Sequence, residues 1–263
     1  MRRLSESDLR FVVETVADRR RDHERVVELI RDKPDLVEPL LDDPRLMERL
    51  AASEETLARL SPYLLFSILL RQVQRDLEGA GYVYEIGARG RRLPVFEAPQ
   101  VVELLHDTAV REYLVELLCS FVRTHSSVVY WKERGTWHKR KFSDLDMDDM
   151  ILLAKLVPPE LRARYYQRVA DLALFYSGVF PDYAALSVAR PRTAFTAQRT
   201  LADYESEGQR FYKLLARQGD EPRLTPVFET LGEQFTLARR ALNTLSDRYL
   251  KAYRARYFAP PGG

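Results

Sequence analysis

Apolar residues near the C-terminus recur in a regular alternation of three and four positions. They are Phe228, Leu231, Phe235, Ala238, Leu242, Leu245, Tyr249 and Ala252. Residues three and four apart share one face of an α-helix, so the spacing predicts a long helix. Its length of about three and a half heptads is typical of a helix that packs lengthwise on another.

The segment before this helix carries the same spacing. Its apolar positions are Leu201, Tyr204, Gly208, Phe211 and Leu215. Gly219 to Pro222 supply turn residues between the two segments, and Thr225-Pro226 is typical of a helix start. We expect a long antiparallel helix pair that packs within the chain. Alternatively, the apolar face of the C-terminal helix packs against a second copy of the chain and forms a homodimer.

Helix signals also cover most of the remaining chain. Ser5 and Asp8 have the spacing of a capping box, and the helix that they begin is predicted to reach about residue 32. Ser61-Pro62 begins another helix, apolar almost all round and therefore central to the core. Further helices are expected over residues 99–106, 109–124, 143–156 and 160–179.

Two stretches depart from the helical period. Residues 82–97 and 126–142 alternate apolar and polar side chains around short turns, which is typical of β-hairpins. The predicted fold is therefore mainly α: a multi-helix bundle with two short antiparallel β-hairpins and a long C-terminal antiparallel helix pair. Residues 1–263 are taken as a single domain; the alternative divides it into 1–125, with the first hairpin, and 126–263, with the second.

The composition narrows the classes of function. With 46% hydrophobic and 30% charged residues, the chain belongs to the globular class. Its 41 basic and 39 acidic residues nearly balance, so only a local patch could attract a polyanion. The single Cys119 favours a reducing compartment, and no apolar stretch is long enough for a bilayer crossing. We expect a cytoplasmic protein with no membrane partner and no cofactor.

The second hairpin is the strongest candidate for a binding site. If Arg134-Gly135 forms its turn, Lys132 lies opposite Trp137 and Tyr130 opposite Lys139. Interleaved cations and aromatic rings can neutralise phosphates and stack bases, or bind an acidic protein. The candidate residues are Tyr130, Lys132, Trp137, Lys139, Arg140 and Lys141, with Arg89, Arg91 and Arg92 from the tip of the first hairpin. The alternative is that these aromatics pack on the helices under a cover of basic side chains.

A metal site is the weaker candidate. His106-Asp107 has the dipeptide of the helical HD metal phosphohydrolases, in which His and Asp bind the metal that activates water. Glu103 and His106 also have the spacing of one half of a di-iron motif, of which the chain has no second copy. Asp107 follows one predicted helix and precedes the next, so the simpler interpretation is a helix cap.

Asp171 lies in the otherwise apolar stretch 169–180. A carboxylate in such a helix requires a partner or a shifted pKa, and Arg71 and Arg75 are the expected partners. The sequence has no G-x-S-x-G, P-loop, Rossmann glycine, CxxC or H-E-x-x-H motif.

These observations favour a non-enzymatic helical scaffold or regulatory module that binds another macromolecule, most simply a protein. A nucleic-acid-binding protein that uses the hairpin at residues 126–142 is the first alternative. A metal-dependent phosphohydrolase centred on His106 and Asp107 is the second.

Overall fold

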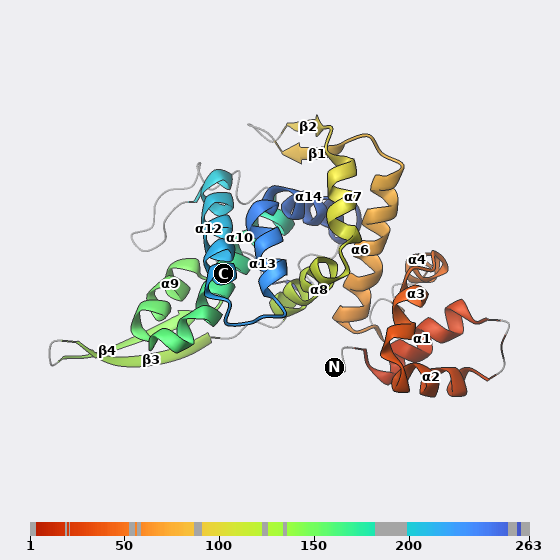
Figure 1. The fold of residues 1–263 in the computed structure, drawn as a ribbon, viewed down its shortest axis with the longest axis horizontal. Helices are drawn as coiled ribbons and strands as arrows, with labels where there is room; N and C mark the ends of the chain where they lie inside the picture. Colours follow the sequence, from red (N-terminus) through yellow and green to blue (C-terminus); the bar gives the residue numbers. More distant parts are fainter. Residues whose placement is uncertain are drawn as a thin grey trace.

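The described part of the chain consists of helices and two small β-hairpins (Figure 1). The computed structural model describes residues 4–18, 20, 22–52, 56, 59–86, 91–122, 126–133, 136–181, 199–251 and 257–258, with the backbone alone for residues 34, 86, 126–133 and 136–141. The predicted mainly helical fold class is confirmed. No helix in these ranges combines the length and the apolar character that a bilayer crossing requires.

The first half contains six helices, a 3-10 turn and the first hairpin among its described elements. They are α1 (Glu6–Val16), α2 (His23–Asp32), η1 (Pro34–Leu36), α3 (Val37–Leu41), α4 (Arg45–Ala51), α6 (Pro62–Glu78), β1 (Val83–Ile86), β2 (Arg92–Val95) and α7 (Ala98–His106).

The second half begins with a long helix that leads to the second hairpin. Its described elements are α8 (Thr108–Val122), β3 (Ser126–Glu133), β4 (Thr136–Ser143), α9 (Met147–Leu156), η3 (Pro159–Leu161), α10 (Arg162–Val179), α12 (Leu201–Gln218), α13 (Thr225–Glu233), α14 (Phe235–Leu245) and the π-helical turn η5 (Ser246–Leu250).

The N-terminal helices form a small lobe beside α6 (Figure 1). The predicted capping box is present, because Ser5 Oγ accepts from the Asp8 N–H and the Asp8 carboxylate accepts from the Ser5 N–H. The single helix predicted to reach residue 32 is wrong, since α1 ends at Val16 and α2 begins at His23. The chain turns back there, so that apolar residues of α1 and α2 form a small core of their own, made of Leu9, Val13, Val27 and Ile30.

Helix α6 is central, as its sequence predicts. Ser61 caps it and Pro62 occupies the first turn, where a missing N–H costs nothing. Its residues are buried on nearly all sides against α7, α8 and α14. The main hydrophobic core joins residues from both sides of position 125, from Phe11 to Phe258.

The C-terminal helix pair is present, with α12 packed on α13, but its second member is divided. At Gln234 the helical dihedrals are interrupted, with φ −110° and ψ 29°, and α14 continues in a new direction (Figure 1). This division lets α13 pack on α12 while α14 packs on α10, α7, α6 and β1. The seam residues from Phe228 to Leu245 are buried inside the chain.

Candidate functional site

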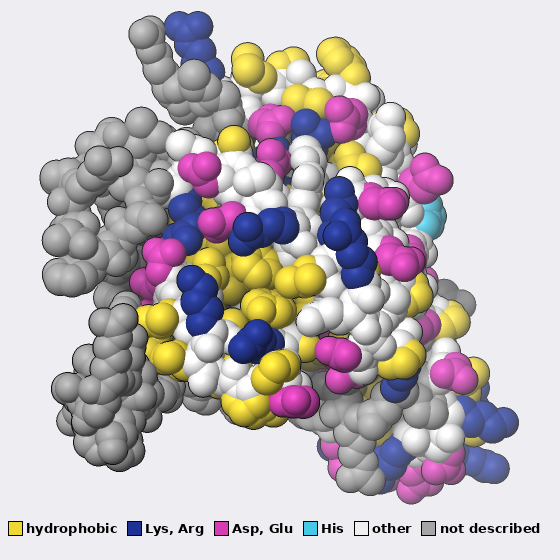
Figure 2. Space-filling model, turned by 60° about the vertical axis from the view of Figure 1, so that its left-hand side comes forward, with side chains coloured by type: hydrophobic (Ala, Val, Ile, Leu, Met, Phe, Trp, Pro, Cys, Tyr) yellow, Lys and Arg dark blue, Asp and Glu magenta, His cyan; other side chains and the backbone are white. Residues whose placement is uncertain are grey.

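A groove of about 660 Å³ lies between α9, α10 and α12. Figure 2, which looks onto this side of the molecule, shows a hydrophobic area with separate basic side chains around it. The groove is lined by Ile151, Lys155, Tyr166, Ser206, Gln209, Arg210, Phe211, Lys213, Leu214 and Arg217.

The floor of the groove is aromatic and aliphatic. The rings of Tyr166 and Phe211 lie 5.4 Å apart with 31° between their planes. Phe211 is 5% exposed and belongs to the main core, whereas Tyr166, Ile151 and Leu214 are half-buried and form the open part of the floor. The groove therefore offers apolar surface that is continuous with the interior.

The rim of the groove is cationic. Lys155 lies at the last turn of α9, and Arg210, Lys213 and Arg217 lie three and four residues apart on α12. All four are exposed, and none forms an ion pair with any residue that the structure describes. The Arg210 guanidinium lies 4.7 Å from the centre of the Phe211 ring. Since the described lining contains no Asp or Glu, this positive charge is uncompensated inside the groove.

The end of the groove near the start of α12 is different. Arg199 there bonds Asp148 of α9 at 2.6 Å and Glu207 of α12 at 2.8 Å. Burial opposes the charge of Arg199, but the hydrogen bonds and charges of these two carboxylates outweigh it and raise the arginine pKa above its ordinary value. The ion pairs link two walls of the groove at this end.

Two glycines allow α12 to lie close to its neighbours. A Cβ atom on Gly208 would lie 2.2 Å from Cε2 of Phe235, and one on Gly232 would lie 2.7 Å from Cγ of Lys213. The aliphatic stem of Lys213 therefore packs over Gly232 of α13, with its ammonium group left at the rim.

A buried polar cluster anchors α12, one wall of the groove, to α8 and α10. Asp171 of α10 accepts hydrogen bonds from the hydroxyls of Tyr113 at 2.6 Å and Tyr212 at 2.7 Å, and Gln167 donates to the Tyr113 oxygen at 3.1 Å. Burial raises the pKa of Asp171 to about 6, against the opposing effect of the two hydroxyl donors. One carboxylate thus joins α8, α10 and α12.

The predicted partners of Asp171 are wrong. Arg71 instead forms ion pairs with Glu38 and Asp42 of the N-terminal lobe, and Arg75 donates to the backbone carbonyl of Asp42. Asp171 is hydrogen-bonded by two tyrosine hydroxyls and by no arginine. Its pKa is therefore raised, because neutral donors offset the effect of burial only in part.

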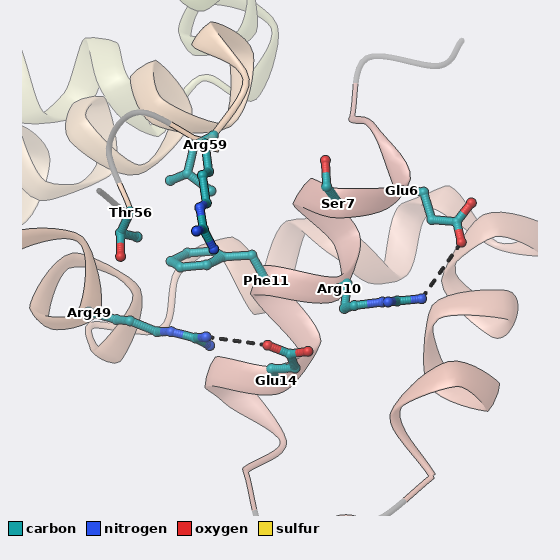
Figure 3. Close-up of a pocket in the computed structure, with 9 residues that line it drawn as sticks. Glu6, Ser7, Arg10, Phe11, Glu14, Arg49, Thr56 and Arg59 are labelled. Atoms are coloured by element: carbon teal, nitrogen blue, oxygen red, sulfur yellow. Dashed lines mark hydrogen bonds and ion pairs between the residues drawn. The ribbon is translucent and has the colours of Figure 1, made fainter. Parts of the chain in front are cut away.

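A second hollow, of about 470 Å³, lies between α1, α4 and the residues Thr56, Arg59 and Leu60 that precede α6. Figure 3 shows Phe11 at its centre, with Arg49 directed to Glu14 and Arg10 to Glu6. Arg49 also lies over the Phe11 ring at 4.7 Å. Because carboxylates of α1 offset these arginines, this hollow lacks the uncompensated charge of the groove.

The second hairpin has the predicted register. Tyr130 lies opposite Lys139, and Lys132 lies opposite Trp137. Phe142 at its base is buried in the main core. The side chains of the candidate residues Tyr130, Lys132, Trp137, Lys139, Arg140 and Lys141 lie outside the described part of the structure.

The backbones of the two hairpins lie apart. In Figure 1 the first hairpin is at the top of the view beside α7, and the second is at the far left beside α9. Arg92 forms an ion pair with Asp247 at 3.0 Å, Arg91 is exposed, and Arg89 lies outside the described residues. Strand β2, which carries Arg92, therefore lies away from β3 and β4.

Asp107 acts as a helix cap. Its Oδ1 accepts from the N–H groups of Ala109 at 2.8 Å and Val110 at 3.2 Å. The neighbouring His106 is exposed and lies 3.1 Å from the Gln74 amide. Among the described residues, no group of three or more His, Cys, Asp or Glu side chains is placed to hold a metal ion.

The rim of the groove was not predicted from the sequence. The sequence does contain a pattern for its α12 side, because the cations Arg210, Lys213 and Arg217 are spaced by three and four residues, with Leu214 among them. The apolar seam of α12 defines one face of that helix, and the cations follow another. Lys155 could not be added from spacing, since it comes from a different helix.

Comparison of the chain with protein-family models, curated proteins and solved structures gave no match. The function must therefore be inferred from the geometry and the charge of the groove itself.

Proposed function

We propose that this chain is a non-enzymatic helical scaffold or regulatory module, active in the cytoplasm, that binds another macromolecule through the groove between α9, α10 and α12. The observation that supports the proposal is the set of four exposed cations around an apolar floor, none of them ion-paired with a described residue. Such a surface attracts a polyanion and offers it apolar contact as well.

Binding of a labelled polyanion tests this function. The probes are fluorescent poly-L-glutamate and a short oligothymidylate, measured by anisotropy at low and high salt. We expect the protein to bind at least one of them, with an affinity that falls as salt rises. The variant Lys213→Glu/Arg217→Glu should bind at least about tenfold more weakly, because it reverses half of the charge at the rim.

A matched control reverses two cations elsewhere. Arg25 and Lys33 are exposed residues at α2, in the N-terminal lobe. The variant Arg25→Glu/Lys33→Glu has the same net charge as the groove variant and should retain the wild-type affinity. Equal weakening in both variants, or no binding of either probe, would contradict the proposal.

Nucleic-acid binding by the second hairpin is the other candidate function. Its support is the observed register, in which an aromatic and a cationic position face each other at Tyr130 and Lys139 and again at Trp137 and Lys132. Under this alternative, oligothymidylate binding is lost in Lys139→Glu/Arg140→Glu and retained in the groove variant.

A further inference from the structure

We infer that the groove is a receptor for an acidic amphipathic α-helix of about three turns, supplied by a protein partner. This inference rests on the proposed function and names the partner of the same site.

The length of the groove sets the length of the ligand. Along α12 its lining runs from Ser206 to Arg217. At a rise of 1.5 Å per residue this stretch spans about 16 Å, which a helix of about twelve residues matches. A segment of that size can lie in the groove as an additional helix of the bundle.

The distribution of apolar and charged groups sets the ligand's pattern. Ile151 of α9 and Leu214 of α12 supply aliphatic surface from both walls. Lys155 adds a cation on the α9 side, while Arg210 and Lys213 add cations on the α12 side. A complementary helix therefore has an apolar stripe with carboxylates on both flanks, and more of them on the flank that faces α12.

The aromatic rings favour a helix over single-stranded nucleic acid. Bases stack on exposed ring faces, but Phe211 is 5% exposed and the Arg210 guanidinium lies over its ring at 4.7 Å. Tyr166, tilted by 31° against Phe211, is half-buried. The floor offers hydrophobic contact to side chains and no row of open stacking platforms.

The walls are fixed before a ligand arrives. Arg199 joins α9 to α12 through Asp148 and Glu207, and the Tyr212 hydroxyl joins α12 to Asp171 of α10. The fold therefore sets the backbone positions from which the cations of α9 and α12 extend.

Two fluorescent peptides test the inference on the full-length protein. The first is a capped peptide of about twelve residues, with leucines at alternate spacings of three and four and glutamates on both flanks. The second has the same composition in scrambled order. We expect the amphipathic peptide to bind at least about tenfold more tightly than the scrambled one.

Protein variants locate the binding. Lys213→Glu/Arg217→Glu should lose affinity for the amphipathic peptide and gain affinity for a version with lysine in place of glutamate. Leu214→Ser should lower the affinity for the amphipathic peptide by a larger factor than the affinity for poly-L-glutamate, because the peptide's leucines contact the apolar floor. Circular dichroism and thermal unfolding check that each variant is folded.

The outcomes separate this inference from the proposed function. The amphipathic and scrambled peptides could bind equally well, with the groove variant impaired for both. This result would contradict the inference that the ligand is a helix, but it would support a groove that selects ligands by charge. Preference for oligothymidylate at the groove would replace the protein partner by nucleic acid. No groove-dependent binding of any probe would remove both proposals.

Discussion

In α14, Arg239 is 1% exposed and bonds Glu85 and Glu205, whereas Arg217 of α12 lies exposed at the rim of the groove without a carboxylate partner among the described residues. The two arginines serve opposite purposes. A buried guanidinium is tolerable only with charged and hydrogen-bonding partners, which then fix the elements that supply them. An exposed arginine without a partner contributes little to folding and remains available for a ligand.

The same division holds for other basic residues. Arg240 bonds Glu85 and Glu97, so the first hairpin, α7 and α14 meet at one set of ion pairs. Burial, reinforced by the nearby charge of Arg71, lowers the pKa of Arg111, which bonds Glu38. Buried arginines therefore join parts of this fold, and the rim cations do not.

The largest expected effect is at Arg239. We expect Arg239→Ala to lower the free energy of unfolding by about 3 to 5 kcal/mol, because it empties a buried site that joins α14 to β1 and α12. Glu205 loses its ion pair, and Glu85 keeps only the one with Arg240. Urea denaturation measures the change. The control Arg217→Ala should alter stability by less than about 0.5 kcal/mol. Similar losses of stability in Arg239→Ala and Arg217→Ala would contradict the distinction between buried and exposed arginines.

Asp171 differs from the buried arginines. It is a buried acid with no basic partner in hydrogen-bonding contact among the described residues. Its pKa is raised from 3.8 to about 6, so the folded state holds the proton more tightly than the unfolded state. Its ionisation therefore costs stability as the pH rises from about 4 to 6, and the full cost applies above pH 6. Asp171→Asn, which keeps an acceptor for both tyrosines, should be more stable than the wild type at pH 7 by up to about 3 kcal/mol.

The pH dependence distinguishes this cause from improved packing. The advantage of Asp171→Asn should shrink as the pH falls from 7 to 4, which urea denaturation across that range will show. An advantage independent of pH would contradict an ionised Asp171 as its source.

The smallest of these effects is expected at Glu38, which serves both Arg71 and Arg111. Glu38→Gln should lower the free energy of unfolding by about 1 to 2 kcal/mol, a limited loss because the Glu38 side chain is one third exposed. Denaturation at low and high salt should show a larger loss at low salt. Unchanged stability would mean that Asp42 alone satisfies the pair.

Local signals were predicted well from the sequence. The capping box at Ser5 and the Ser61-Pro62 start are encoded within a few residues, and the register of the second hairpin follows from the length of its turn. The interruption at Gln234 could not be predicted, because the apolar spacing continues through it without a proline or an extra residue.

Long-range partners were the harder part. The burial of Asp171 followed from its apolar neighbours, but its tyrosine donors lie 58 and 41 positions away and no local pattern marks them. The groove poses the same difficulty. Its walls come from three helices, and whether Lys155 or Arg217 has a partner depends on the tertiary fold.

The link from Tyr212 to Asp171 has a consequence for binding thermodynamics. Because it fixes α12 on the core, the protein loses little conformational entropy when the groove is filled. The ordering cost then falls on the proposed partner helix, which has to form from a coil when it binds. Among partner segments of equal composition, the one with the highest helix content in solution should therefore bind most tightly.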